Sequence, residues 1–159
     1  MILVLLGTFP LQFDRPLKEI DLLLQKGLIN EEVIVQNGHT AFQSNHMVFR
    51  PFLDLNELLK LYDQADLIIS QAGTGSIIKG LKKNKKIIAI PRLAKYGEVV
   101  DDHQVELVNE FAEGGYLLPW LEGEALEKIL AQAKTFEPKP FHSNNGEMMK
   151  FLIQYIDGL

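Results

Sequence analysis

The sequence predicts an α/β fold, a Rossmann-like doubly wound parallel sheet covered by helices on both faces. Short runs of apolar residues, several rich in β-branched side chains, recur along the chain without polar alternation. Such runs are typical of strands that are buried on both faces of a sheet. Between most of them, apolar residues follow helical spacing. Strands that alternate with helices indicate βα units and therefore parallel pairing.

The expected strands share this continuously apolar character. They are Ile2–Leu6, Val33–Val35, Met47–Phe49, Leu67–Ile69, Ile87–Ile90 and Tyr116–Leu118. The segment from Gln36 to Met47 is short for a helical crossover, so the topology of this connection stays open.

The expected helices each carry an apolar stripe. The stripes are Phe13, Leu17, Ile20 and Leu24; Leu55, Leu58, Leu59 and Tyr62; Val105, Val108, Phe111 and Ala112; and Leu126, Ile129, Leu130 and Ala133. Asp54 is the expected N-cap of the second helix, with Glu57 completing a capping box. A terminal helix is expected at about 144–157, capped by Asn144 and Glu147, stopped at Gly158 and packed by ordinary core contacts.

Composition favours one soluble globular domain over residues 1–159. Hydrophobic residues make up 47% and charged residues 23% of 159 residues. The net charge is −5, and the short lysine cluster at 82–86 reads as a solvated turn, so no nucleic-acid partner is expected. Cysteine is absent, which excludes disulfides and thiol nucleophiles. No signal peptide or membrane-spanning run is recognisable, so any membrane association is expected to come through a partner.

A glycine-rich turn follows the expected strand Leu67–Ile69. Its sequence is Ser-Gln-Ala-Gly-Thr-Gly-Ser over residues 70–76, with a helix beginning near Gly75. In a doubly wound sheet, ligands bind outside the carboxyl ends of strands. Glycine lets the backbone approach a phosphate, and the free amides and dipole of the helix attract its charge, with hydroxyl donors from Thr74 or Ser76. A plain βα turn that uses glycine only for its geometry fits the spacing equally well.

Two better-known phosphate loops do not fit this turn. A dinucleotide fingerprint requires a third glycine where this chain has Ile78, and a Walker loop requires Gly-Lys-Ser/Thr where Gly75 precedes Ser76. The next strand ends in Pro91-Arg92 rather than in an acid that binds ribose. Nicotinamide cofactors and simple NTPase chemistry are therefore disfavoured.

A polar segment, residues 91–107, follows the next strand and is expected beside the glycine turn. It contains Asp101, Asp102, His103 and Gln104, whose side chains can donate to and accept from sugar hydroxyls. A solvated loop with acids at a helix N-terminus would account for the two aspartates but not for His103 and Gln104.

At this point the sequence resembles the C-terminal domain of family 28 glycosyltransferases. The residues that carry the resemblance occur in order: Val4–Phe9 with Phe13-Asp14, Pro51–Leu53, Ala65-Asp66, Ser70–Ser76, Pro91-Arg92, Tyr96–Glu98 and Asp101–Gln104. The likeness extends to about Leu118 and is strongest to the stand-alone versions. These are the cytosolic subunit of the two-chain N-acetylglucosaminyltransferase of dolichol-linked glycan assembly and PssE-like proteins of capsule and exopolysaccharide synthesis.

The resemblance implies a site for a UDP-sugar in the donor-binding half of a GT-B glycosyltransferase. By this resemblance the sugar diphosphate is bound by Gly7, Thr8, Gln71, Gly73, Thr74, Gly75 and Ser76; the uracil by Phe52 and Leu53; and the transferred sugar by Asp102, His103 and Gln104.

Three positions depart from the family pattern. Relatives often have His where this chain has Gln71 and Val99, and many enzymes of this fold place a ribose-binding Glu where it has Lys79. Gln71 can donate a neutral hydrogen bond to phosphate but cannot carry charge.

The expected function is donor binding in an inverting transfer of a hexosyl or N-acetylhexosaminyl group from a UDP-sugar to a lipid-linked saccharide. The chain offers no clear general base and is about half the length of a two-domain enzyme, so base and acceptor site are expected on a membrane-anchored partner. The expected location is the cytoplasm, at the inner face of the membrane through that partner.

No cofactor or metal is expected, because His39, His46 and His142 are isolated from acids at metal-ligand spacing. Two alternatives stay open. One is a non-catalytic nucleotide-sugar-binding or scaffold subunit, and the other is a UDP-sugar epimerase.

Overall fold

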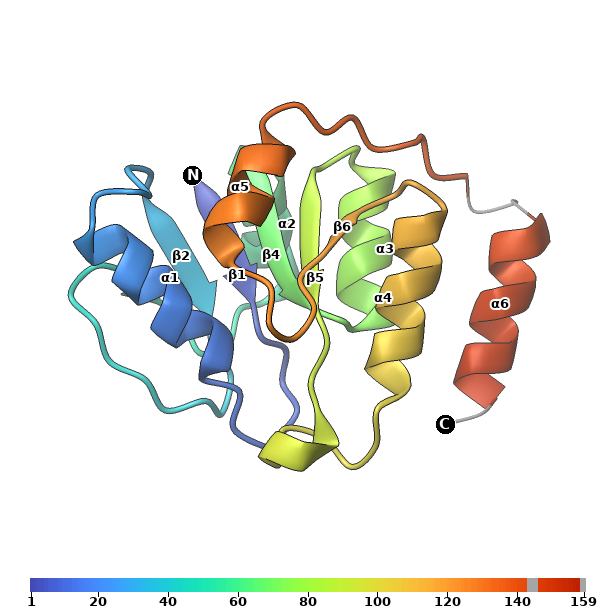
Figure 1. Cartoon of the computed structure of the whole chain (residues 1–159), viewed down its shortest axis with the longest axis horizontal. Helices are drawn as coiled ribbons and strands as arrows, with labels where there is room; N and C mark the ends of the chain where they lie inside the picture. The colour runs from blue at the N-terminus through green and yellow to red at the C-terminus, as the bar shows by residue number, and fades with distance from the viewer. Residues whose placement is uncertain (143–145, 158–159) are drawn as a thin grey trace.

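Six parallel strands form one sheet in the order β3-β2-β1-β4-β5-β6 within the described chain (Figure 1). The structure is a computed structural model that describes residues 1–142 and 146–157. The strands are β1 Ile2–Leu5, β2 Val33–Gln36, β3 Val48–Phe49, β4 Leu67–Gln71, β5 Ile87–Ile90 and β6 Leu118–Pro119. This is the doubly wound order, with its direction reversing between β1 and β4. The predicted Rossmann-like parallel sheet is confirmed.

Helices cover both faces of the sheet (Figure 1). Alternate residues of β1 divide between the two cores, with Val4 on one side and Leu3 on the other. The first core contains α1 Arg15–Gln25 and α5 Leu126–Ala133. The second contains α2 Leu55–Gln64, α3 Thr74–Lys82 and α4 His103–Glu113. The four central strands, β1, β2, β4 and β5, are mainly apolar because both of their faces are buried.

The helices begin where local signals place them. Asp54 Oδ1 accepts a hydrogen bond from the Glu57 amide at 2.8 Å, and Glu57 Oε2 accepts one from the Asp54 amide at 3.2 Å, so the predicted capping box is confirmed. Helix α3 begins at Thr74, one residue before the predicted Gly75. The lysine cluster after it is a turn, with Asn84 at φ 57°.

Both ends of the sheet depart from the strand predictions. Strand β3 is a two-residue edge strand, and Val48 is 42% exposed, so the prediction of burial on both faces is wrong there. It pairs with β2 in parallel although residues 37–47 contain no helix. Strand β6 begins at Leu118 rather than at Tyr116, because the Tyr116 amide still bonds to the Phe111 carbonyl at the end of α4 (3.1 Å).

Helix α6, Gly146–Asp157, lies beside α4 at the edge of the second helical layer (Figure 1). Met148, Leu152 and Tyr155 are buried in the second core, as ordinary packing requires. A second stripe, formed by Met149, Ile153 and Ile156, is exposed. The predicted cap at Asn144 and the stop at Gly158 lie outside the described residues.

Candidate functional site

A cavity of about 380 Å³ lies where the strand order reverses. It is built by the segments that follow the carboxyl ends of β1, β3 and β4, together with the last residue of β2 and the first turns of α2. Doubly wound folds bind ligands in this crevice. The lining residues are Leu5, Gly7, Thr8, Gln36, Phe52, Leu53, Leu58, Gln71, Gly73, Thr74, Gly75 and Ser76. The structure therefore brings every residue predicted for the diphosphate and the uracil into one cavity. Their roles stay predictions.

One end of the cavity is the N-terminus of α3. The first intrahelical bond runs from the Ile77 amide to the Gly73 carbonyl, and within the described chain no side chain caps this helix. The amides of the first turn and the helix dipole therefore offer a place for negative charge. Tyr62 holds this turn from below through a hydrogen bond from its hydroxyl to the Ser76 carbonyl at 2.9 Å, and burial raises the pKa of Tyr62 to about 12.

Phe52 and Leu53 form another part of the cavity wall. Phe52 is 57% exposed, and the ring of His39 meets it edge-on with centroids 5.3 Å apart. An exposed aromatic ring at a cavity mouth can stack on a planar ligand group.

Gln36 connects the loop after β1 to the segment before α2, and the sequence analysis did not identify it. Its Oε1 accepts from the Gly7 amide at 3.0 Å, and its Nε2 donates to the carbonyls of Gly7 (3.0 Å) and Pro51 (2.9 Å). Gly38 also needs to be glycine, because a Cβ there would lie 2.3 Å from the Gly7 carbonyl oxygen. The sequence did contain a signal for Gln36, because it is a polar residue that directly follows an apolar strand at the ligand-binding edge of the sheet.

Gln71 lies at the end of β4 with its side chain next to two glycines. A Cβ at Gly7 would lie 2.5 Å from Gln71 Nε2, and one at Gly73 would lie 2.7 Å from it. Gln71 Oε1 accepts from Arg92 Nε at 3.1 Å and from Gln104 Nε2 at 3.4 Å. Both glycines therefore make room for this amide.

The three residues predicted for the sugar are not brought together. Gln104 reaches the cavity only through Gln71, and its Oε1 accepts from the Arg92 amide at 2.9 Å. His103 lies at the start of α4, with Nε2 3.6 Å from Asp101 Oδ2 and its ring edge-on to Tyr155. Asp102 Oδ1 accepts from the Ala94 amide at 2.9 Å.

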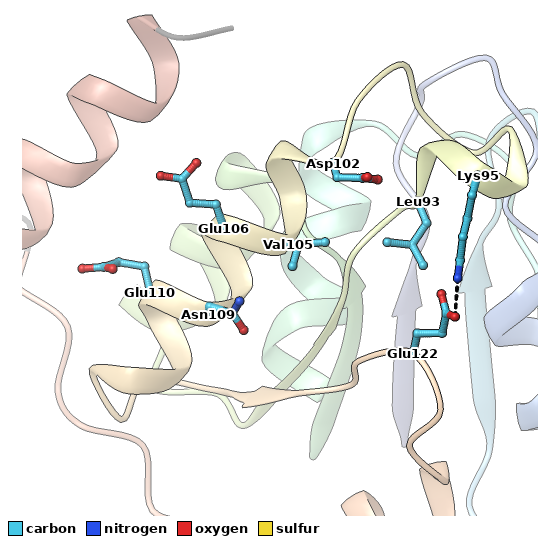
Figure 2. A pocket seen from close by; sticks show the side chains of 8 residues that line it. All are labelled: Leu93, Lys95, Asp102, Val105, Glu106, Asn109, Glu110 and Glu122. Carbon is cyan, nitrogen blue, oxygen red and sulfur yellow. Dashed lines mark hydrogen bonds and ion pairs between the residues drawn. The ribbon is translucent and has the colours of Figure 1, made fainter.

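Asp102 lines a second, wider cavity of about 680 Å³ (Figure 2). Figure 2 shows Asp102, Glu106 and Glu110 along α4, with Lys95 paired to Glu122 across from them. The wall along α4 is acidic, so this cavity is a poor place for a phosphate group.

A partly buried ion pair fixes the loop between β5 and α4. Glu98, 4% exposed, accepts from Arg15 Nε at 2.8 Å, from Arg15 Nη2 at 2.9 Å and from the Leu93 amide at 2.8 Å. Arg15 also donates to the Pro91 carbonyl at 3.0 Å, and its guanidinium lies 5.3 Å from the centre of the Tyr96 ring. The start of α1 thus holds the loop in place. No sequence pattern pairs Arg15 with Glu98, since 83 residues separate them.

Two further properties bear on chemistry. Across residues 1–142 and 146–157, no group of three or more His, Asp or Glu side chains is placed to hold a metal ion. No helix in those ranges has the length and apolar character needed to cross a bilayer.

In sequence, the chain is similar to subunits of a sugar transferase. The UDP-N-acetylglucosamine transferase subunit ALG13 of Saccharomyces cerevisiae is 34% identical over 96 residues, 59% of this chain and 46% of that protein. ALG13 of Candida glabrata is 29% identical over 104 residues, 65% and 49% of the two chains. The matched region spans about half the length of these relatives.

Solved structures share the fold. An NMR solution structure of ALG13 matches with a TM-score of 0.57 at 21% identity, covering 96% of this chain and 94% of that chain. Acinetobacter baumannii MurG matches with a TM-score of 0.55 at 20% identity, covering 83% and 40%. The fold thus corresponds to one half of a GT-B glycosyltransferase, as predicted.

A comparison with protein families matches residues 1–154 to the glycosyltransferase family 28 C-terminal domain. Since this match covers nearly the whole chain, the protein belongs to the family of glycosyltransferase family 28 C-terminal domains.

Proposed function

We propose that this chain is the donor-binding subunit of a split inverting glycosyltransferase that uses a UDP-sugar. The observation that carries the proposal is the cavity at the strand-order reversal, which joins an uncapped helix N-terminus to an exposed aromatic residue, Phe52. The first suits a diphosphate and the second a nucleobase. The related ALG13 proteins are named as subunits of a UDP-N-acetylglucosamine transferase, which makes UDP-N-acetylglucosamine the first donor to test.

In this proposal the chain stabilises the departing UDP. Charge develops on the β-phosphate as the bond to the anomeric carbon breaks, and the amides of α3 would lie where that charge forms. The incoming hydroxyl must lose a proton, and the residues lining the cavity provide hydrogen-bond donors and apolar contacts. We therefore assign the general base and the acceptor site to a partner chain, with a lipid-linked saccharide of polysaccharide or glycan assembly as acceptor.

The carboxyl edge of the sheet supports a partner at this site. Phe9 (39%) and Leu11 (38%) are exposed in the loop after β1, and Tyr96 (51%) and Val100 (82%) in the loop before α4. Apolar side chains gathered around a ligand cavity are typical of an interface. Val99, next to Val100, is partly buried. A membrane-anchored partner would place the chain at the cytoplasmic face of a membrane.

Nucleotide binding tests the donor site directly. Calorimetry with a chelator present should show UDP binding more tightly than ADP or GDP, because the Phe52-Leu53 segment would select the base and no metal would be needed. Equal affinities for the three nucleotides, or binding only with magnesium or manganese, would contradict the proposal.

A transferase assay tests whether activity requires two chains. The purified chain with UDP-N-acetylglucosamine and a lipid-linked acceptor should be inactive, and activity should appear when the membrane-bound partner chain is added. Robust turnover by the chain alone would overturn the two-chain assignment. Donor binding without transfer in the reconstituted pair would favour a scaffold subunit.

A further inference from the structure

Arg92 is buried beneath the donor cavity. It is 1% exposed, and its guanidinium donates to the carbonyls of Leu6, Leu11 and Glu98 at 2.9 Å each. The rings of Phe13 and Phe9 lie 4.8 and 5.4 Å from its central carbon. A further side-chain bond, from Nε, goes to Gln71 Oε1 at 3.1 Å. A buried guanidinium is costly unless it is hydrogen-bonded, and here each of the three nitrogens donates at least one bond.

This last bond determines which way the Gln71 amide points. Arginine can only donate, so the oxygen of Gln71 must face Arg92. Gln104 Nε2 approaches the same oxygen, while Gln104 Oε1 is engaged by the Arg92 amide. The Gln71 NH₂ group is therefore left beside Gly7 and Gly73, both of which line the cavity.

The charge balance below the cavity is positive. Arg92 and Arg15 are the two cations of this cluster, and Glu98 is its one carboxylate among the described residues. The Glu98 carboxylate is bound by Arg15 and by the Leu93 amide. Arg92 bonds to Glu98 only through the Glu98 backbone carbonyl, and not through its carboxylate. Burial lowers the pKa of Arg92 to about 10, against the opposing effect of Glu98, and the group stays charged at neutral pH.

We propose that Arg92 is a positioning residue that serves as the cationic element of the donor site and acts through Gln71. It orients the Gln71 amide so that the NH₂ group can donate a hydrogen bond to a ligand in the cavity. Its positive charge also makes that NH₂ group a stronger donor to an anion. A neutral glutamine thus gains the electrostatic assistance that its own side chain cannot provide. The inference rests on the proposed function, because it takes the anion to be the diphosphate of a UDP-sugar.

The main test is a double-mutant cycle between Arg92 and Gln71, with UDP and uridine as ligands. Arg92→Met should weaken UDP binding about tenfold in the wild-type background, as expected for a charge-assisted hydrogen bond, and less than about twofold in Gln71→Met. Uridine affinity should change less than about twofold throughout, since uridine carries no phosphate. Additive effects of the two substitutions, or equal losses for UDP and uridine, would overturn the proposal.

A second variant keeps the test decisive if Arg92→Met does not fold. Gln71→Glu retains the acceptor for Arg92 and Gln104 but replaces the NH₂ donors with a carboxylate oxygen. It should fold at least as well as the wild type, judged by thermal unfolding, and lose UDP affinity by about 100-fold while uridine still binds. Unchanged UDP affinity in this variant would refute the role of Gln71 and Arg92. A wild-type chain that binds UDP no better than uridine would instead refute the proposed function.

Discussion

Helices α2 and α3 both begin at the carboxyl edge of the sheet, yet their first turns are treated in opposite ways. At α2, the Asp54 and Glu57 side chains satisfy backbone amides reciprocally. At α3, the N-cap is Gly73, and no side chain in the described part of the protein caps the amides of the first turn. Both helices carry the same dipole. The chain stabilises one N-terminus and leaves the other open toward a cavity, so local stability has been given up where we propose that a diphosphate binds.

The largest effect on UDP affinity should come from giving α3 a side-chain N-cap like the one that α2 has. Gly73→Asp would place a carboxylate on the amides of the first turn and repel a diphosphate. UDP affinity should fall on the order of 100-fold or more, by calorimetry. Gly73→Ala is the control, because it also adds the Cβ that displaces Gln71 Nε2.

The Asp variant should nevertheless be the more stable of the two, by about 1 kcal/mol in urea denaturation, because aspartate is a good N-cap. If Gly73→Asp binds UDP as well as Gly73→Ala does, the amides of α3 do not hold the phosphates.

Removing the N-cap of α2 should lower stability without affecting UDP binding. Asp54→Ala removes the capping box and should lower the free energy of unfolding by about 1 kcal/mol, with UDP affinity unchanged. Urea denaturation checks the first effect and calorimetry the second. Asn56→Ala, in the same first turn, should cost less stability; an equal cost would show that the cap contributes nothing.

A smaller effect separates the sugar from the diphosphate. Gln104→Ala should weaken UDP-sugar binding by about 0.5–1.5 kcal/mol and UDP binding by less, if Gln104 bonds to the sugar. Isothermal titration with both ligands measures the difference. Equal losses would assign Gln104 to supporting Gln71, which its 3.4 Å contact with Gln71 Oε1 also permits.

The smallest effect concerns the hydroxyl of Ser76 in the first turn of α3. Ser76→Ala should weaken UDP and UDP-sugar alike, by about 0.5–1 kcal/mol, because the diphosphate is common to both. Asn109→Ala, in the wider acidic cavity, is the matched control and should leave both affinities unchanged. If Asn109→Ala weakened binding as much as Ser76→Ala, the site that we propose for the diphosphate would be contradicted.

Much of the fold could be predicted from the sequence because the signals are local. Buried parallel strands must be apolar on both faces, so β1, β4 and β5 were recognisable from a few consecutive residues. The cap of α2 lies within four residues of chain, and it was also predicted. The strand order came from the structure, but a doubly wound sheet binds ligands at the carboxyl ends of its strands, which placed the glycine turn at the ligand-binding edge.

Only the tertiary structure decided how the polar side chains at this edge are paired. Arg92 donates to Leu6, 86 residues away, and Gln36 joins Gly7 to Pro51 across two loops. Asp102 and His103 looked suited to a sugar by their chemistry, but the start of α4 turns one toward the wider cavity and the other toward α6. Hydrophobic periodicity reports which face of an element is buried. It carries no information about which distant hydrogen-bond partner a side chain meets once loops pack together, and that pairing determines the site.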